Sequence, residues 1–396
     1  MKFSLIPREF VLSNGKFDLL NALKQGGYFA GECYDQEGYD HIIQEPEEKT
    51  IKRVMLTLDN GHHSVYDHIF VTLNFESIPK IWAMVLNNEK VYVTSEKSSR
   101  YTPITPESGV SEREMTLYDK WKAIFISLIQ KRYGNIFDSK KIKKLAQENA
   151  RYMVSVFVNT KMIYTVSLRQ INIIYSMVYD FLQKSPNIDQ VFYEKMLPDA
   201  LYFLKRCKEL NLINNNLAQN TKQRQLSLFI RREMSGADYI GGSVYSIKYW
   251  GSIAQLAQAH RHRTINYSAW FKFNTGLFYC PPIIAEVGGC SLLSEWNSDL
   301  KSVENYFPQG QNIGIVEEGT IDNFLLKCKE RLCFNAQLEI MQRTKNSLLL
   351  LYQQCPSGVK KQELQRYLYG ARCTFGYKCS NNCGYPEEGV ALLRII

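Results

Sequence analysis

Apolar and polar residues alternate along this chain in patterns that predict both strands and helices. Residues 69–75 are rich in β-branched and aromatic side chains, which predicts a strand, and residues 81–86 continue as an apolar helical segment. Helical spacing of apolar positions follows over 113–133, 141–157 and 166–182. Strands that alternate with helices favour an α/β (α+β) fold over an all-β fold.

The later part of the chain repeats this alternation. Residues 242–249 predict a strand, and residues 252–263 predict a helix that carries a basic tripeptide at its C-terminal end. Residues 335–354 have the apolar spacing of a long helix. The second part therefore has the same types of element as the first.

A polar stretch separates the two parts. Residues 209–225 follow a helical run and hold six Asn or Gln residues between Asn211 and Asn220, with little apolar periodicity. This composition is typical of a linker. We therefore expect an N-terminal domain over 1–208 and a C-terminal domain over 226–396, and the length of 396 residues suits two domains.

Composition narrows the class of protein. The net charge of +9, from 48 basic and 39 acidic residues, is spread along the chain without a long basic run or an RNA-binding motif, so we expect small anionic molecules and not nucleic acid as partners. The N-terminus lacks the apolar core of a signal peptide, and no uncharged apolar stretch of about 18 residues predicts a membrane span. The ten scattered cysteines favour a reducing cytoplasm.

The basic tripeptide Arg261-His262-Arg263 is the first candidate for chemistry. Three consecutive side chains that can carry positive charge need an anion, and the flanking stretches are apolar. A bland alternative is that these cations compensate the dipole at a helix C-terminus. Residues 95–101, far upstream, look like the anion-binding loop to which such a tripeptide would normally lead.

Together these two segments resemble the signature of the flavin-dependent thymidylate synthases, the ThyX family. Its first part, Arg-His-Arg, matches residues 261–263, and its last part matches Glu96, Ser98, Arg100 and Tyr101. Neither half of the chain holds the whole signature. The first half has Asn88-Glu89-Lys90 in place of Arg-His-Arg, and the second half has residues 269–273 in place of the loop. This complementary loss predicts a tandem duplication.

Three further segments resemble the same family. Residues 61–68 are similar to its Gly-His-x-Ser/Thr-x-x-Glu-His segment. Residues 148–151 with residues 165–169 are similar to its Ala-Arg helix and its later Thr-Val-Asn-x-Arg stretch. Residues 331–340 are similar to the segment that carries its catalytic arginine. The resemblance implies two tandem ThyX-like domains, each a mixed sheet packed with helices.

In this family each active site is built across the subunits of a tetramer. The resemblance implies that the second half of this chain supplies Gln258, Arg261 and Arg331 to one site. The first half would supply Glu96, Ser98, Ser99, Arg100 and Arg151. Two fused chains would then imitate the tetramer, so we expect a homodimer.

The resemblance also implies a reaction, the reductive methylation of dUMP at C5. Methylenetetrahydrofolate would supply the carbon, and FAD reduced by NADPH would supply the hydride. Arg331 would be the catalytic residue, because it would stabilise negative charge on the uracil ring. The substrate would also contact Gln258, Arg261, Glu96, Ser98, Ser99, Arg100 and Arg151. The flavin would contact Ser64, Arg261, His262, Arg263, Glu96, Ser167 and Arg169.

Several departures from the family pattern leave alternatives open. Asn335 replaces a histidine, Ser167 replaces an asparagine, and Ser95 replaces the Asn of Asn-Glu. A related pyrimidine nucleotide such as UMP is therefore an alternative substrate, and a non-catalytic flavin- or nucleotide-binding protein is an alternative function.

The C-terminal cysteines suggest a further site. The thiolates of Cys355, Cys373, Cys379 and Cys383 could bind zinc, although their spacing is not the usual pair of Cys-x2-Cys motifs. The alternative is that they are reduced or partly buried thiols.

Overall fold

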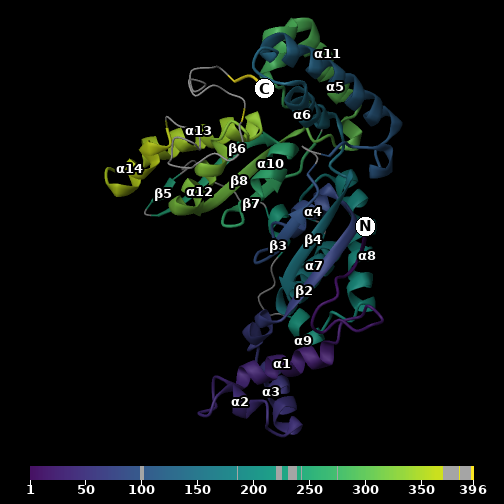
Figure 1. Cartoon of the computed structure of the whole chain (residues 1–396), viewed down its shortest axis with the longest axis vertical. Coiled ribbons are helices and arrows are strands. Elements are labelled where there is room, and N and C mark those ends of the chain that lie inside the picture. The colour runs from purple at the N-terminus through teal and green to yellow at the C-terminus, as the bar shows by residue number, and fades with distance from the viewer. Residues whose placement is uncertain are drawn as a thin grey trace. The chain divides into compact units, whose positions relative to one another are not determined.

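The structure is a computed structural model in which the chain forms two compact units. It describes residues 1–98, 102–184, 186–219, 225–230, 239–241, 243–273, 275–368, 383 and 394–396. Unit 1 comprises Met1–Lys97 and Asn159–Ser227, and unit 2 comprises Ser98–Val158 and Leu228–Ile396 (Figure 1). Each predicted domain, 1–208 and 226–396, thus contains most of one unit, but residues 98–158 pack with the second.

Unit 1 is built around a four-stranded antiparallel sheet with the order β1-β2-β4-β3. Its elements are β1 Lys2–Leu5, α1 Leu19–Gly31, α2 Tyr39–Ile42, α3 Glu47–Asp59, η1 His63–His68, β2 Phe70–Pro79, α4 Lys80–Leu86, β3 Val93–Glu96, β4 Asn159–Ser167, α7 Leu168–Gln183, α8 Gln190–Glu209 and α9 Asn215–Ala218. Helices α4 and α7 pack on the sheet, where alternate residues of β2 and β4 such as Leu73 and Tyr164 are fully buried.

Unit 2 has a second four-stranded antiparallel sheet, with the order β5-β6-β8-β7. Its strands are β5 Tyr239–Gly241, β6 Val244–Ser252, β7 Asn266–Trp270 and β8 Asn312–Thr320. Its α-helices are α5 Glu112–Tyr133, α6 Ser139–Ala150, α10 Ile253–Ala259, α11 Gly289–Ser302, α12 Ile321–Arg331, α13 Leu338–Gln354 and α14 Val359–Arg366. Shorter helical turns are η2 Pro106–Ser108, η3 Arg151–Met153, η5 Ile284–Gly288 and η6 Glu304–Tyr306. A further turn, η4 Ser227–Phe229, begins at the last residue of unit 1 and continues into unit 2.

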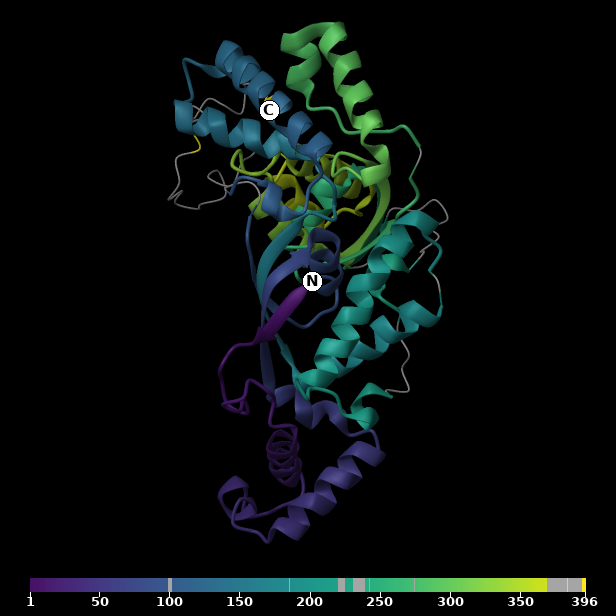
Figure 2. The ribbon, with the colours of Figure 1, turned by 90° about the vertical axis from the view of Figure 1, so that its right-hand side faces the viewer.

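Two apolar cores stabilise unit 2. In one, α12, α13 and α14 pack on the sheet through residues such as Tyr245 and Phe324. In the other, α5 and α6 pack against α11 (Figure 2). There the Trp121 and Trp296 rings meet edge to face, with their centroids 4.7 Å apart. Because α5 and α6 complete this second core, residues 98–158 belong to unit 2.

The two sheets match in strand order, and their pairs next to the short helices match in register. Both have a strand, a short helix, an edge strand, a long excursion, and a strand that leads directly into a helix. In the first sheet, Glu96 pairs with Met162 and Pro79 with Asn159. The corresponding pairs in the second sheet join Ala269 to Ile315 and Ser252 to Asn312. A bulge in β2 between Phe75 and Ile78 is the one irregularity between β2 and β4.

This register gives the tripeptide a structural counterpart. Helix α4 ends at Leu86 and β3 begins at Val93, whereas α10 ends at Ala259 and β7 begins at Asn266. The two connections therefore have equal length. Asn88-Glu89-Lys90 occupies the place in the first connection that Arg261-His262-Arg263 occupies in the second, as the sequence comparison of the two halves implied.

Most predicted elements are present, and the α+β class is confirmed. The strands predicted at 69–75 and 242–249 correspond to β2 and β6, and the helices at 81–86 and 113–133 correspond to α4 and α5. Both sheets are antiparallel throughout their described pairs, whereas mixed sheets were expected.

Three predicted helices have different ends. The helix expected over 141–157 stops at Ala150, because the next residues turn and the backbones of Val154 and Val156 bond to Gln309 and Phe307 instead. The helix expected over 166–182 begins only after Ser167, which ends β4 and caps α7. The helix expected over 335–354 begins at Leu338.

The helix that was expected to carry the tripeptide is also shorter than predicted. Ser252 is the N-cap of α10, and the helix ends at Ala259. Residues 261–263 therefore lie in the loop between α10 and β7 and not on the helix. The predicted linker, 209–225, includes a short helix, α9, which packs on α7.

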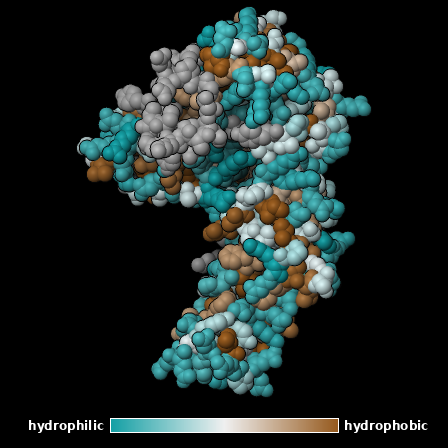
Figure 3. All heavy atoms as spheres, viewed as in Figure 1, coloured by the Kyte–Doolittle hydropathy of each residue, from teal (hydrophilic) through white to brown (hydrophobic). Residues whose placement is uncertain are grey.

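Polar side chains cover most of the face drawn in Figure 3, with smaller apolar patches between them. Within the part of the chain that the structure describes, no helix is long and apolar enough to cross a membrane.

Candidate functional site

A buried glutamine in unit 2 joins three segments that are far apart in sequence. The Gln337 side-chain oxygen accepts hydrogen bonds from Arg151 Nη2 at 2.8 Å and from Gln258 Nε2 at 2.6 Å. Arg151 follows α6, Gln258 lies in the last turn of α10, and Gln337 caps α13. All three residues are at most 5% exposed. The structure thus places two of the predicted substrate residues, Arg151 and Gln258, on one shared acceptor.

A buried carboxylate, Glu339, is linked to Gln337 through the hydroxyl of Tyr152. Glu339 accepts hydrogen bonds from the Ser252 backbone N–H at 2.8 Å, from the Ser252 hydroxyl at 2.6 Å and from the Tyr152 hydroxyl at 3.0 Å. The Tyr152 hydroxyl in turn accepts from the Gln337 amide. Burial raises the pKa of Glu339 and raises the pKa of Tyr152 well above its usual value. This network fixes the starts of α10 and α13 relative to each other.

The predicted catalytic arginine contacts the basic tripeptide. Arg331, the last residue of α12, donates from Nε to His262 Nε2 at 2.5 Å, and its Nη2 lies 3.5 Å from the Gln258 carbonyl oxygen. Burial, with the neighbouring cations Arg331 and Lys327, lowers the pKa of His262 to about 2. The Arg261 and Arg263 side chains are exposed on the same loop.

Three of the predicted flavin residues lie close together in unit 1. Asp67 accepts hydrogen bonds from the Ser167 hydroxyl at 2.6 Å and from Arg169 Nη1 at 2.8 Å. Ser64 is exposed one turn earlier in η1. Arg169 Nε is buried and has no hydrogen-bond partner among the described residues. Ser167 and Arg169 offer a hydroxyl and a guanidinium that suit the sugar and phosphate groups of a flavin nucleotide, although Asp67 offsets the charge of Arg169.

The predicted phosphate loop is described only in part. Glu96, at the end of β3, accepts from Lys80 Nζ at 2.5 Å and lies 3.5 Å from Asn87 Nδ2. The Ser98 carbonyl accepts from the Thr102 backbone N–H at 3.0 Å. The predicted contacts of Ser99 and Arg100 lie outside the described residues. The roles of this segment therefore stay predictions.

The predicted zinc site is also only partly covered. Cys355 lies in the core formed by α12, α13 and α14, and Cys383 packs against the core formed by α5, α6 and α11. Cys373 and Cys379 lie outside the described residues. The eight cysteines that the structure describes are all free thiols.

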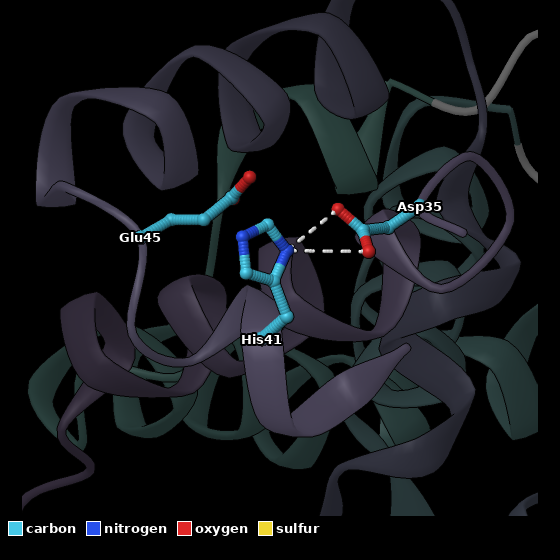
Figure 4. A group of neighbouring side chains, drawn as sticks. All are labelled: Asp35, His41 and Glu45. Atoms are coloured by element: carbon cyan, nitrogen blue, oxygen red, sulfur yellow. Dashed lines mark hydrogen bonds and ion pairs between the residues drawn. The ribbon is translucent and has the colours of Figure 1, made fainter. Parts of the chain in front are cut away.

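A different cluster of potential metal ligands is present in unit 1. Asp35, His41 and Glu45 place one ligand atom each within 4.8 Å of one another (Figure 4), and they are the one such group in the described ranges. However, Glu45 is paired with Arg53 and with Lys49, which lies 3.3 Å away. A guanidinium beside the carboxylate opposes a metal ion electrostatically, so we interpret this cluster as two local sets of polar contacts, Asp35 with His41 of α2 and Glu45 with α3.

Sequence reasoning missed the residues that connect the site. Gln337 and Glu339 were visible within the matching segment, and a glutamate between apolar residues is a signal of a paired buried charge. Tyr152 and Ser252 gave no such signal, because a tyrosine and a helix-capping serine are ordinary at these positions.

Comparison with known proteins finds similar sequences for the N-terminal part of the chain. Residues 22–180 match the model of the family described as Thymidylate synthase complementing protein. A flavin-dependent thymidylate synthase from Pyrococcus furiosus is 26% identical over 148 residues, which are 35% of this chain and 57% of that protein. Over this segment the chain is similar to the flavin-dependent thymidylate synthases. Proteins of the same name from Thermococcus onnurineus and Clostridium tetani are 24% and 25% identical, over 35% of this chain and over 56% and 61% of their own lengths.

The comparisons cover only part of this chain. The chain spans 57% of the length of the Pyrococcus furiosus thymidylate synthase. The family match ends at residue 180, before the segment that holds Arg261 and before Arg331. The relation of the second sheet to the same family therefore depends on its motifs and on the register that it shares with the first sheet.

Proposed function

We propose that this protein is a flavin-dependent thymidylate synthase that methylates dUMP at C5, with methylenetetrahydrofolate as carbon donor and NADPH as reductant. The observation that carries the proposal is the meeting of Arg151, Gln258 and Arg331 around Gln337 and His262. The resemblance assigns these three residues to opposite sides of the family's site, yet they come together within one compact unit of a single chain.

The chemistry of each side chain suits this role. The Gln258 side-chain oxygen is buried and has no hydrogen-bond partner among the described residues, so it can accept an N–H group such as that of a pyrimidine ring. Arg331 keeps a permanent positive charge, which stabilises the negative charge that develops on the ring. Arg151 adds a second buried cation for the anionic nucleotide.

The loop after α10 offers Arg261 and Arg263 for the flavin phosphates. Within unit 1, Ser64, Ser167 and Arg169 form a separate cluster of residues that the resemblance assigns to the flavin. FAD, when bound, would supply the hydride for the methyl group. The side chains of this protein would bind and orient the substrates and the flavin, and none of the proposed site residues would act as a covalent nucleophile.

The tandem duplication supports a single site of this kind in each chain. The first sheet has Asn88-Glu89-Lys90 where the second has Arg-His-Arg, and the second sheet has Ala269 where the first has Glu96. Each chain therefore supplies one full set of the family's residues. A homodimer would imitate the family tetramer. A mass equal to one chain, measured by light scattering, would contradict the homodimer.

The activity is tested on the purified full-length chain. The two visible absorption bands of oxidised flavin should appear after FAD is added, and dUMP with methylenetetrahydrofolate and NADPH should release tritium from C5-labelled nucleotide. Arg331→Ala should abolish release and leave the flavin bound. The matched control is Arg366→Ala, which removes an exposed arginine at the end of α14 and should leave turnover unchanged.

Other results would separate the alternatives. Bound flavin without any tritium release from dUMP or UMP would indicate a non-catalytic binding protein. Release from UMP that exceeds release from dUMP would assign the other substrate. Full turnover of the Arg331→Ala variant would refute the catalytic role of this residue.

A further inference from the structure

The hydrogen bond between Arg331 and His262 defines the state of the histidine. Arg331 Nε carries a hydrogen and points to His262 Nε2 at 2.5 Å. An arginine does not lose its proton in proteins, so the histidine nitrogen is the acceptor and carries no proton. The central residue of the basic tripeptide is therefore a neutral imidazole that accepts a hydrogen bond from Arg331.

The surroundings of His262 explain why it stays neutral. Helix α12 directs two cations toward it, Arg331 and Lys327, and the two other basic residues of its own loop, 261 and 263, are exposed. On the strands β7 and β8, the Tyr267 ring lies 5.9 Å from Lys327 Nζ, and Glu317 is paired with Lys327 at 2.5 Å. A third positive charge at this point would be repelled by both cations of α12.

Lys327, one of the two cations near His262, forms a fully buried ion pair with Glu317. They are 1% and 0% exposed, and the glutamate also accepts from the Tyr245 hydroxyl at 2.8 Å and from the Tyr249 hydroxyl at 3.2 Å. Lys327 lies one helical turn before Arg331 on α12. The pair therefore anchors the helix to the sheet immediately before the arginine.

The first sheet provides an internal comparison, since β4 leads into α7 as β8 leads into α12. The seventh and eleventh residues of α12 are Lys327 and Arg331, whereas those of α7 are the buried Ile174 and Val178. Glu89 occupies the place of His262. The arginine, its histidine acceptor and the lysine are thus all present in one repeat and all absent from the other, as expected of residues that act together.

We propose that His262 is a positioning residue that accepts the Nε–H of Arg331 as a neutral imidazole and thereby directs the remaining guanidinium N–H groups toward the substrate, while Lys327 and Glu317 fix the helix that carries the arginine. This inference rests on the proposed function for its catalytic consequence. It differs from the role that the resemblance gives His262, which is contact with the flavin.

The first experiment compares His262→Ala with His262→Gln in the full-length, flavin-loaded protein. The glutamine side-chain oxygen can reach the place of Nε2 and accept the same hydrogen bond. We expect His262→Ala to lower kcat by about 10²-fold with unchanged flavin content, because a misplaced catalytic group costs about that much. His262→Gln should recover most of the loss. His41→Gln, the same change outside the site, should leave kcat unchanged.

The second experiment does not depend on turnover. In a ¹⁵N NMR titration of the histidine side chains, His262 should stay neutral between pH 5 and 8, with its proton on Nδ1, and should become easier to protonate in Arg331→Ala. Titration near the usual pKa of about 6.5 with Arg331 intact would overturn the inference. If His262→Ala and His262→Gln both lose the flavin, His262 contacts the flavin and the inference is wrong. If the unaltered protein shows no turnover, the proposed function fails, and this titration alone decides whether His262 accepts from Arg331.

Discussion

At the scale of single residues, an uncharged amide organises the charged groups of the candidate site. The Gln337 oxygen accepts from Arg151 and Gln258, and its nitrogen donates to Tyr152. A glutamine can do both because it offers an acceptor and two donors and does not ionise. A carboxylate in its place would neutralise Arg151, which the proposed function needs as a cation for the nucleotide.

Replacement of this amide should therefore be costly. Gln337→Leu leaves buried donors on Arg151 and Gln258 without their acceptor, and we expect a loss of about 2 kcal/mol in the free energy of unfolding. Urea unfolding followed by circular dichroism measures it. Gln365→Leu, at an exposed position of α14, is the matched control and should change stability little. An unchanged urea midpoint for Gln337→Leu would show that the network adds nothing to stability.

The neutral His262 also predicts how stability depends on pH. The imidazole takes up a proton near pH 6.5 in the unfolded chain but only at about pH 2 in the fold. Between these values the unfolded state binds more protons, so the histidine's contribution is fully present above pH 6.5 and is lost as pH falls. The slope for a half-buried group is about 1 kcal/mol per pH unit at most. His262→Gln should flatten the fall in urea midpoint between pH 6.5 and 5, and an identical slope in both proteins would contradict this.

At the scale of elements, the strand-to-helix junctions position the site. Ser252 ends β6, caps α10 by accepting from the Gln255 N–H at 3.0 Å, and binds Glu339. Thr320 ends β8 and caps α12 in the same way, by accepting from the Asn323 N–H at 3.2 Å. The first junction thus combines a cap with a tertiary hydrogen bond to Glu339 of α13, whereas among the described residues Thr320 donates no side-chain hydrogen bond to a third element.

These two junctions provide a matched pair of substitutions. Thr320→Ala should cost about 1 kcal/mol, the usual effect of a lost cap. Ser252→Ala should cost about 2 to 3 kcal/mol, because it also leaves the buried Glu339 short of one donor. Thermal or urea unfolding of both variants gives the comparison. Equal losses would mean that the Ser252–Glu339 hydrogen bond does not stabilise the fold.

At the scale of the whole molecule, the two sequence halves are not the two compact units. Residues 98–158 lie in the first half but supply α5 and α6 to the second unit, where Trp121 and Phe125 pack against Trp296. They also supply Arg151 to the candidate site. The excursion between β3 and β4 therefore belongs to unit 2, which a division of the chain at a single linker does not describe.

This arrangement predicts how fragments behave. A fragment of residues 226–396 lacks α5 and α6 and would expose the apolar side of α11, so it should not unfold cooperatively by itself. Mixing it with a fragment of residues 1–225 should restore a cooperative transition and bury Trp296, which fluorescence can follow. A cooperative transition of the isolated 226–396 fragment at the temperature of the whole chain would contradict the assignment of 98–158 to this unit.

The sequence by itself determined several strands and helices, and it predicted that the family's residues are divided between two repeats. Local periodicity gave β2, α4, α5 and β6, because burial of one face imposes a period of two or about 3.6 residues on neighbouring positions. The register of the sheets then agreed with the complementary placement of residues 88–90 and 261–263. These features depend on short stretches of chain.

Only the tertiary structure decided which side chains meet. Arg151 and Gln337 are 186 positions apart, and their contact depends on how α6, α10 and α13 pack and not on any local pattern. The same holds for the end of α10, which releases the tripeptide into a loop where His262 accepts from Arg331. Sequence patterns encode burial along one element, whereas a hydrogen bond between distant side chains requires the packed positions of several elements at once.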